Sequence, residues 1–169
     1  MELKIHKGFF NTQTLNQIKE HCEKAQSEIH IKAKGTWASN LTEGRGDVNI
    51  HILREREYPI LFKTIVEKME QSFDRTPAAI MFYYWDPESF VGWHNDANHS
   101  AAASIYLNKN WEPNYGGYFM YKKQGDHEIK AEKPSYNKCI FQSGSVWHAT
   151  TLTHWKAPIR KSLQVFFDE

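Results

Sequence analysis

The spacing of apolar residues predicts two helices in the first half of the chain. Leu15, Ile18 and Cys22 recur at helical spacing, and Asn11 or Thr12 can cap the start of this helix. Pro59 opens a second helix, in which one apolar residue follows every four positions: Leu61, Ile65, Met69 and Phe73. A helix with one apolar face buries that face, so both helices are expected to pack on a sheet.

Short apolar runs separated by turn residues predict that the rest of the chain is mainly β. Two alternating runs, 29–34 and 47–53, flank a loop at 34–46 that is rich in Gly, Ser, Asn and Thr. After Pro77, further short runs follow at 78–85, 89–96, 101–108, 117–122, 128–131, 138–141, 145–148 and 161–167. Such a series of short strands indicates a sandwich or barrel of the jelly-roll type.

These elements together predict a mainly β, α+β fold with two N-terminal helices packed on one sheet. We expect one domain over 1–169, in which 1–77 form a helical flank with the first strands and 78–169 form a β-barrel core.

Composition and charge restrict the function classes. The chain is 40% hydrophobic and carries a net charge of +1, so nothing favours nucleic acid or an anionic membrane surface as a partner. Its two cysteines, Cys22 and Cys139, lie far apart, which argues against a disulfide framework and for a reducing compartment. The N-terminus lacks the apolar core of a secretory signal, and no apolar run reaches the roughly 20 residues that cross a bilayer. We therefore expect a cytoplasmic protein; its oligomeric state does not follow from the sequence.

The stretch 90–96 (FVGWHND) contains two candidate metal ligands. In an extended strand, residues i and i+2 point to the same face, so His94 and Asp96 would present an imidazole and a carboxylate side by side. These are two of the three ligands of the facial triad that holds non-haem Fe(II). The third ligand is expected from a distant strand. His148 ends the run 145–148 and is a better candidate than His154, whose neighbours indicate a loop.

Arg160 is the candidate for binding an anionic ligand. Strand alternation places Arg160, Ser162 and Gln164 on one face of the last strand, while the opposite face is apolar. An arginine that points into the barrel needs an anionic partner, and no carboxylate alternates with it on its strand. A bound dicarboxylate would supply one through a bidentate pair, whereas the alternative is a structural salt bridge at the barrel edge.

With these residues in place, the chain resembles the Fe(II)- and 2-oxoglutarate-dependent dioxygenases, and among them the prolyl 4-hydroxylase-like branch. The resemblance rests on His94-Asn95-Asp96, His148 and Arg160, on Tyr84 before the first ligand, and on the segments 105–111 (IYLNKNW) and Gly116-Gly117. It implies a double-stranded β-helix, which agrees with the predicted strands.

The resemblance also implies cofactors and residue roles. His94, Asp96 and His148 would bind Fe(II), Arg160 and Tyr106 would bind the distal carboxylate of 2-oxoglutarate, and Tyr84 would lie near the iron. Ser162 shares the Arg160 face and is a further candidate for binding the co-substrate. Dioxygen would be the second co-substrate, with ascorbate as a candidate additional cofactor.

The expected function is hydroxylation of an unactivated C–H bond, with release of succinate and carbon dioxide. A prolyl residue in a protein or peptide is the first hypothesis for the substrate, and a free amino acid or small metabolite is the alternative. A binding module without catalysis is less favoured, because it would have no need of the intact set His94, Asp96, His148 and Arg160. The loops at 34–46 and 149–159 would decide between an open groove and a closed pocket.

Overall fold

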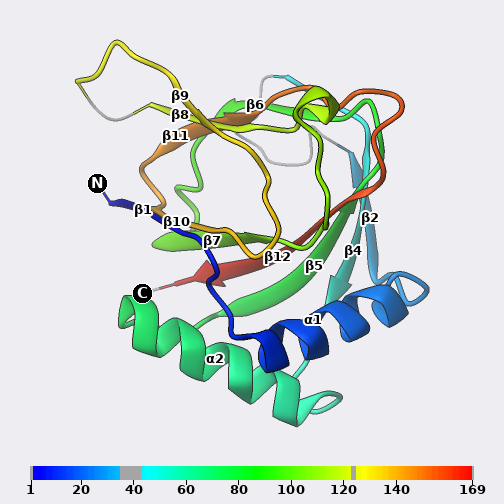
Figure 1. Cartoon of the computed structure of the whole chain (residues 1–169). Coiled ribbons are helices and arrows are strands. Elements are labelled where there is room, and N and C mark those ends of the chain that lie inside the picture. The colour runs from blue at the N-terminus through cyan, green and yellow to red at the C-terminus, as the bar shows by residue number, and fades with distance from the viewer. Residues whose placement is uncertain (1, 35–42, 123–124, 169) are drawn as a thin grey trace.

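The computed structural model describes residues 2–34, 43–122 and 125–168, which form two antiparallel sheets and two helices (Figure 1). One sheet has seven strands in the order β1 (Leu3–His6), β10 (Cys139–Ser143), β7 (Ala101–Tyr106), β12 (Arg160–Phe167), β5 (Ala79–Trp85), β4 (Asp47–Ile52) and β2 (Ile31–Lys34). The other has five, in the order β3 (Gly44–Arg45), β6 (Phe90–His94), β11 (Trp147–Thr150), β8 (Phe119–Lys122) and β9 (Lys130–Glu132). A single 3-10 turn is described at Pro113–Tyr115.

The two predicted helices are confirmed with their start signals. In α1 (Thr12–Ala25), the Asn11 side chain accepts a hydrogen bond from the Thr14 backbone N–H at 2.8 Å and so caps the first turn. In α2 (Pro59–Phe73), Pro59 occupies the first turn. A backbone N–H at that position has no carbonyl partner within the helix, so proline costs no hydrogen bond there. Asp74, the residue that follows the helix, caps its C-terminus in a left-handed conformation at φ 55°.

Both helices cover the same face of the seven-stranded sheet, as the lower half of Figure 1 shows. The core beneath them combines apolar residues of the helices with alternate residues of the sheet, among them Ile18, Ile65, Met69, Phe82, Phe141, Leu163, Val165 and Phe167. The helix-packed face of β12 is therefore the predicted apolar face. Its other face, with Arg160 and Gln164, points into the space between the two sheets.

The jelly-roll prediction is confirmed, with one difference of detail. The described strands form two separate hydrogen-bonded sheets, so the predicted barrel is a sandwich that is not closed by continuous pairing. Two described strands were not predicted: β1 lies before the first helix, and β3 lies in the loop expected at 34–46. Both are short edge strands, which are ordered by pairing to a neighbour more than by their own sequence. Residues 35–42 of that loop lie outside the described residues.

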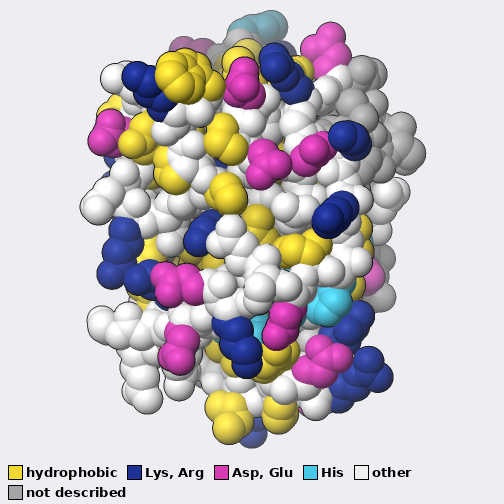
Figure 2. Space-filling view, turned by 90° about the vertical axis from the view of Figure 1, so that its right-hand side faces the viewer, with side chains coloured by type: hydrophobic (Ala, Val, Ile, Leu, Met, Phe, Trp, Pro, Cys, Tyr) yellow, Lys and Arg dark blue, Asp and Glu magenta, His cyan; other side chains and the backbone are white. Residues whose placement is uncertain are grey.

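The charged residues on the surface are mixed in sign. On the face drawn in Figure 2, basic and acidic side chains lie interspersed over the molecule. Several form exposed ion pairs, such as Lys34 with Asp47 at 2.8 Å and Arg45 with Glu88 at 3.5 Å. Neither of the two helices is long and apolar enough to cross a membrane.

Candidate metal and co-substrate site

The candidate site is a cavity between the two sheets. Its lining includes residues from β5, β6, β7, β8, β10, β11 and β12, with Asp96 from the segment after β6. His94, Asp96, His148, Arg160 and Tyr106 all line this one cavity. The structure therefore brings together the three candidate metal ligands and two of the candidate co-substrate residues, which are far apart in the sequence.

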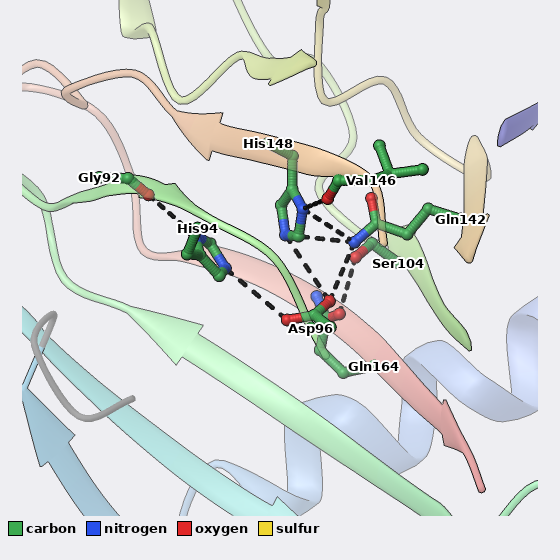
Figure 3. A network of polar contacts seen from close by, with 8 residues as sticks. All are labelled: Gly92, His94, Asp96, Ser104, Gln142, Val146, His148 and Gln164. Carbon is green, nitrogen blue, oxygen red and sulfur yellow. Dashed lines mark hydrogen bonds and ion pairs between the residues drawn. The ribbon is translucent and has the colours of Figure 1, made fainter. Parts of the chain in front are cut away.

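The three candidate metal ligands converge on one point. His94 and His148 are direct cross-strand partners on β6 and β11, and Asp96 follows two residues after His94. The Asp96 carboxylate lies 3.7 Å from His94 Nε2 and 3.6 Å from His148 Nε2, each distance being measured to a different oxygen (Figure 3). Among the described residues, this is the one group of His, Cys, Asp or Glu side chains with ligand atoms clustered closely enough to hold a metal ion.

Backbone hydrogen bonds determine which imidazole nitrogen can bind a metal. Nδ1 of His94 lies 2.8 Å from the Gly92 carbonyl oxygen, and Nδ1 of His148 lies 2.9 Å from the Val146 carbonyl oxygen. A carbonyl oxygen can only accept, so each Nδ1 is the protonated donor and each Nε2 keeps its lone pair. Both lone-pair nitrogens lie on the Asp96 side, which is the arrangement a metal requires.

Burial keeps His148 in the neutral form that a metal needs. The side chain is almost fully buried, and this lowers its pKa to about 4, although the nearby Asp96 carboxylate acts in the opposite direction. His148 is therefore neutral at physiological pH even without a metal.

Gln142 is a member of the site that the sequence analysis missed. Its side-chain amide donates to Asp96 Oδ2 at 2.9 Å, and its Nε2 lies 3.1 Å from His148 Nε2. The predicted strand stopped at Phe141, one residue before Gln142, whereas β10 continues to Ser143. The available signal was alternation: Ile140 and Gln142 share the face opposite to Cys139 and Phe141, and the latter two belong to the helix-packed core.

Arg160 is buried without an acidic partner among the residues that the structure describes. The residue is 7% exposed, its Nη1 lies 3.5 Å from the Gly117 carbonyl oxygen, and its Nε has no hydrogen-bond partner among the described residues. The guanidinium carbon lies 5.9 Å from the centre of the Trp85 ring. Burial lowers the pKa of Arg160, and no carboxylate of the described residues contributes to that pKa. The structural salt bridge considered as the alternative is absent from the described residues, and the binding of an external anion stays a prediction.

Tyr106 lines the same cavity as Arg160. Its ring is 2% exposed, and burial raises the pKa of its hydroxyl to about 12, while Arg160 acts in the opposite direction. The hydroxyl is therefore protonated at neutral pH and can donate a hydrogen bond. Ser162, the cross-strand partner of Tyr106, accepts a hydrogen bond from Gln164 at 2.9 Å, and Gln164 in turn accepts one from Ser104 at 2.7 Å.

The expectation for Tyr84 was wrong. Its side chain lies in the core between the sheet and the helices, where the hydroxyl donates to the Cys22 carbonyl oxygen of α1 at 2.5 Å. The residue that lines the cavity from this strand is its neighbour Tyr83. The stretch 79–85 (AIMFYYW) is apolar on both faces, so alternation could not decide which of two adjacent tyrosines points inward.

The rival ligand His154 lies away from the site. Its side chain is exposed, its Nδ1 accepts a hydrogen bond from the Lys156 backbone at 3.1 Å, and its ring lies near Trp155. The loop that carries it is anchored beside Arg160, since Thr153 pairs with Gly116 and its hydroxyl accepts a bond from the Ser89 backbone at 3.0 Å. His148 is therefore the histidine that joins His94 and Asp96.

The comparison with known proteins gives a match in structure and none in sequence. No protein-family model matches the chain, and no curated protein matches it. Among solved structures, a prolyl 4-hydroxylase from Pseudomonas putida aligns with a TM-score of 0.74 and 18% identity, over 99% of this chain and 92% of the other. This chain has the fold of the 2-oxoglutarate- and Fe(II)-dependent oxygenases.

Two further solved structures share this fold. A 2OG-Fe(II) oxygenase family oxidoreductase from Burkholderia pseudomallei aligns with a TM-score of 0.71 and 17% identity, over 98% of this chain and 85% of its own. A prolyl hydroxylase from Trichoplax adhaerens, solved with a peptide fragment of a hypoxia-inducible factor oxygen degradation domain, aligns with a TM-score of 0.72 and 12% identity. The alignment covers 98% of this chain and 83% of the other. At these identities the likeness establishes the fold, and the activity has to be argued from the site itself.

Proposed function

We propose that this protein is an Fe(II)- and 2-oxoglutarate-dependent dioxygenase that hydroxylates an unactivated C–H bond. The observation that carries the proposal is that one cavity contains both a His/Asp/His group and a buried guanidinium that no carboxylate of the described residues pairs with. Two neutral nitrogens and one carboxylate suit Fe(II) and leave other coordination positions open. The guanidinium suits a carboxylate ligand, because a charge-assisted pair offsets the cost of burying the cation.

The roles of the residues follow from their positions in the cavity. His94, Asp96 and His148 would hold the metal through Nε2, a carboxylate oxygen and Nε2. Arg160 would pair with the distal carboxylate of 2-oxoglutarate, and the protonated Tyr106 hydroxyl would donate to the same group. With these bound, iron, 2-oxoglutarate and dioxygen supply the oxidising power for hydroxylation, with succinate and carbon dioxide as co-products. The protein would orient the substrate C–H bond toward the open side of the metal.

For the substrate, we propose a prolyl residue in a protein or peptide. The support is the likeness in fold to the prolyl hydroxylases, one of which was solved with a peptide fragment. A free amino acid or small metabolite is the alternative. Both are tested by measuring succinate release with Fe(II), 2-oxoglutarate and ascorbate present, using proline-containing peptides of mixed sequence against free proline and other amino acids. Succinate above the substrate-free level, with a mass gain of one oxygen in the peptide, would identify a peptidyl substrate.

The class of enzyme is tested by anaerobic titration with Fe(II) and 2-oxoglutarate. We expect a weak visible charge-transfer band in the wild type and in a control variant, Asp126→Ala, whose exposed side chain lies in the loop between β8 and β9. We expect no band and no succinate formation in Asp96→Ala, which removes the anionic ligand. Full activity in Asp96→Ala would refute the metal assignment. No band in the wild type would favour a binding module.

A further inference from the structure

We propose that Gln142 is a positioning residue for the metal ligand Asp96, holding one carboxylate oxygen so that the other is presented to the metal. This inference rests on the proposed function, because it concerns how the same site binds its metal. Gln142 is 4% exposed, and its amide is aimed at the carboxylate and at His148 rather than at solvent (Figure 3).

The backbone places Gln142 where it can reach Asp96. On β10, Gln142 pairs with Ala102 of β7. Ala102 is a small neighbour, which leaves room for a long side chain to extend into the cavity. Gln142 thus reaches from the seven-stranded sheet toward Asp96, which follows a strand of the five-stranded sheet.

The orientation of the Gln142 amide is determined by Asp96. Its NH2 group donates to Oδ2 at 2.9 Å, whereas its Oε1 is buried with no hydrogen-bond partner among the described residues. The reversed amide would place Oε1 against a carboxylate that can only accept, so the reversed orientation is repulsive. The amide therefore keeps its donor on Asp96 even though this leaves its own oxygen unsatisfied.

The second amide hydrogen points toward His148. Because Nδ1 of His148 donates to the Val146 carbonyl, only Nε2 can accept, and Gln142 Nε2 lies 3.1 Å from it. That lone pair is the one a metal would take. In the metal-free protein, Gln142 therefore holds two candidate ligand atoms near each other, and in the metal-bound protein its bond to Asp96 Oδ2 is the one that remains.

This arrangement has a consequence for coordination. With Oδ2 held by Gln142, Asp96 would present Oδ1 to the metal, and monodentate binding would leave more positions open for 2-oxoglutarate and dioxygen. Without the Gln142 donor, both oxygens are free to chelate the metal or to turn toward His148. Partners that orient a metal ligand in this way typically contribute 10- to 100-fold to metal affinity.

The experiment compares Gln142→Met with the matched control Gln164→Met, using Co(II) as the probe. Methionine has a similar length and cannot donate, and Gln164 lines the same cavity but bonds to Ser104 and Ser162 instead of to a ligand. Calorimetry should show about 10- to 100-fold weaker Co(II) binding in Gln142→Met and an unchanged affinity in Gln164→Met. The visible spectrum of bound Co(II) should change only in Gln142→Met, which a merely structural role would not produce.

The outcomes separate this inference from the proposed function. If the wild type binds no Co(II), the proposed function fails, and this inference with it. If the wild type binds Co(II) and Gln142→Met shows the same affinity and spectrum, the positioning role is refuted and the proposed function stands. If Gln142→Met does not fold, Gln142→Asn, whose amide is too short to reach Asp96, takes its place with the same expected loss of affinity. Wild-type affinity in that variant refutes the positioning role equally.

Discussion

Replacing Arg160 with methionine should stabilise the ligand-free protein while abolishing its response to 2-oxoglutarate. The guanidinium is buried, and no carboxylate in the described part of the chain pairs with it; an uncompensated buried charge costs several kcal/mol. Methionine fills a similar space, carries no charge, and adapts to irregular gaps. The substitution should therefore remove the desolvation cost of the buried charge from the folded protein. It should also remove the guanidinium that would bind the carboxylate of 2-oxoglutarate.

The size of the gain follows from the contacts that Arg160 would lose. Its position over Trp85 is a cation–π contact of about 1–2 kcal/mol. Its 3.5 Å approach to the Gly117 carbonyl oxygen is at the limit of a hydrogen bond and contributes less than about 1 kcal/mol. Set against a desolvation cost of several kcal/mol, these losses leave a net stabilisation of about 1–3 kcal/mol. For a chain of this size, each kcal/mol raises the melting temperature by about 2–4 °C.

The assay is thermal and urea unfolding of the wild type and Arg160→Met, each with and without 2-oxoglutarate. Saturating 2-oxoglutarate, at about 100 times its dissociation constant, should stabilise the wild type by about 2.7 kcal/mol and the variant not at all. Lys161→Met is the control, because Lys161 is adjacent on β12 but lines a different pocket, beside α1. It should change stability by no more than about 0.5 kcal/mol and keep the response to 2-oxoglutarate. A variant Arg160→Met that is less stable than the wild type, or that is still stabilised by 2-oxoglutarate, would refute the reasoning.

Two further predictions concern the backbone near Asp96 and the helix-packed face. Gly144→Ala should weaken Co(II) binding about tenfold or more by calorimetry, because the added Cβ would meet the His99 carbonyl and lie 2.7 Å from the Asp96 carbonyl oxygen. Ser145→Ala is the control. An unchanged Co(II) affinity in Gly144→Ala would contradict the prediction. Burial lowers the pKa of His21 from 6.5 to about 4. As the pH drops, His21 therefore becomes protonated in the unfolded chain before it does in the folded protein. The free energy of unfolding falls between about pH 6.5 and about pH 4 for this reason. His21→Gln should remove on the order of 1–2 kcal/mol of that fall in urea titrations, and an unchanged pH slope would contradict it.

Most of the fold could be predicted because its elements carry local signals. The helix starts are marked by Asn11 and Pro59, and helical periodicity gives the buried positions Ile18, Ile65 and Met69. The last strand alternates strictly, so the sequence was sufficient to place Arg160 on the face opposite to Leu163 and Val165. The edge strands β1 and β3 lack such a pattern, because what orders them is pairing to β10 and β6.

The errors at the candidate site have the same physical origin. Tyr83 and Tyr84 lie in a strand that is buried on both faces, and such a strand has no polar alternation to reveal its inward face. Gln142 was missed because the predicted strand stopped one residue before it; alternation could have placed it on the cavity face, but its contact with Asp96, made across 46 residues of sequence, is encoded by no local pattern. A contact between the two sheets is determined only by how they stack.

The division of the site between the two sheets explains why both must be packed for the proposed function. His94 and His148 lie on the five-stranded sheet, whereas Tyr106, Gln142 and Arg160 lie on the seven-stranded sheet, which the helices support from behind. In the proposed function, the co-substrate would span the gap, held by Arg160 at one end and by the metal at the other. Gln142 forms a hydrogen-bonding link from the larger sheet to the ligand Asp96. The distance between the candidate metal ligands and the guanidinium is therefore set by the packing of the sheets, and no carboxylate of the described residues neutralises that guanidinium.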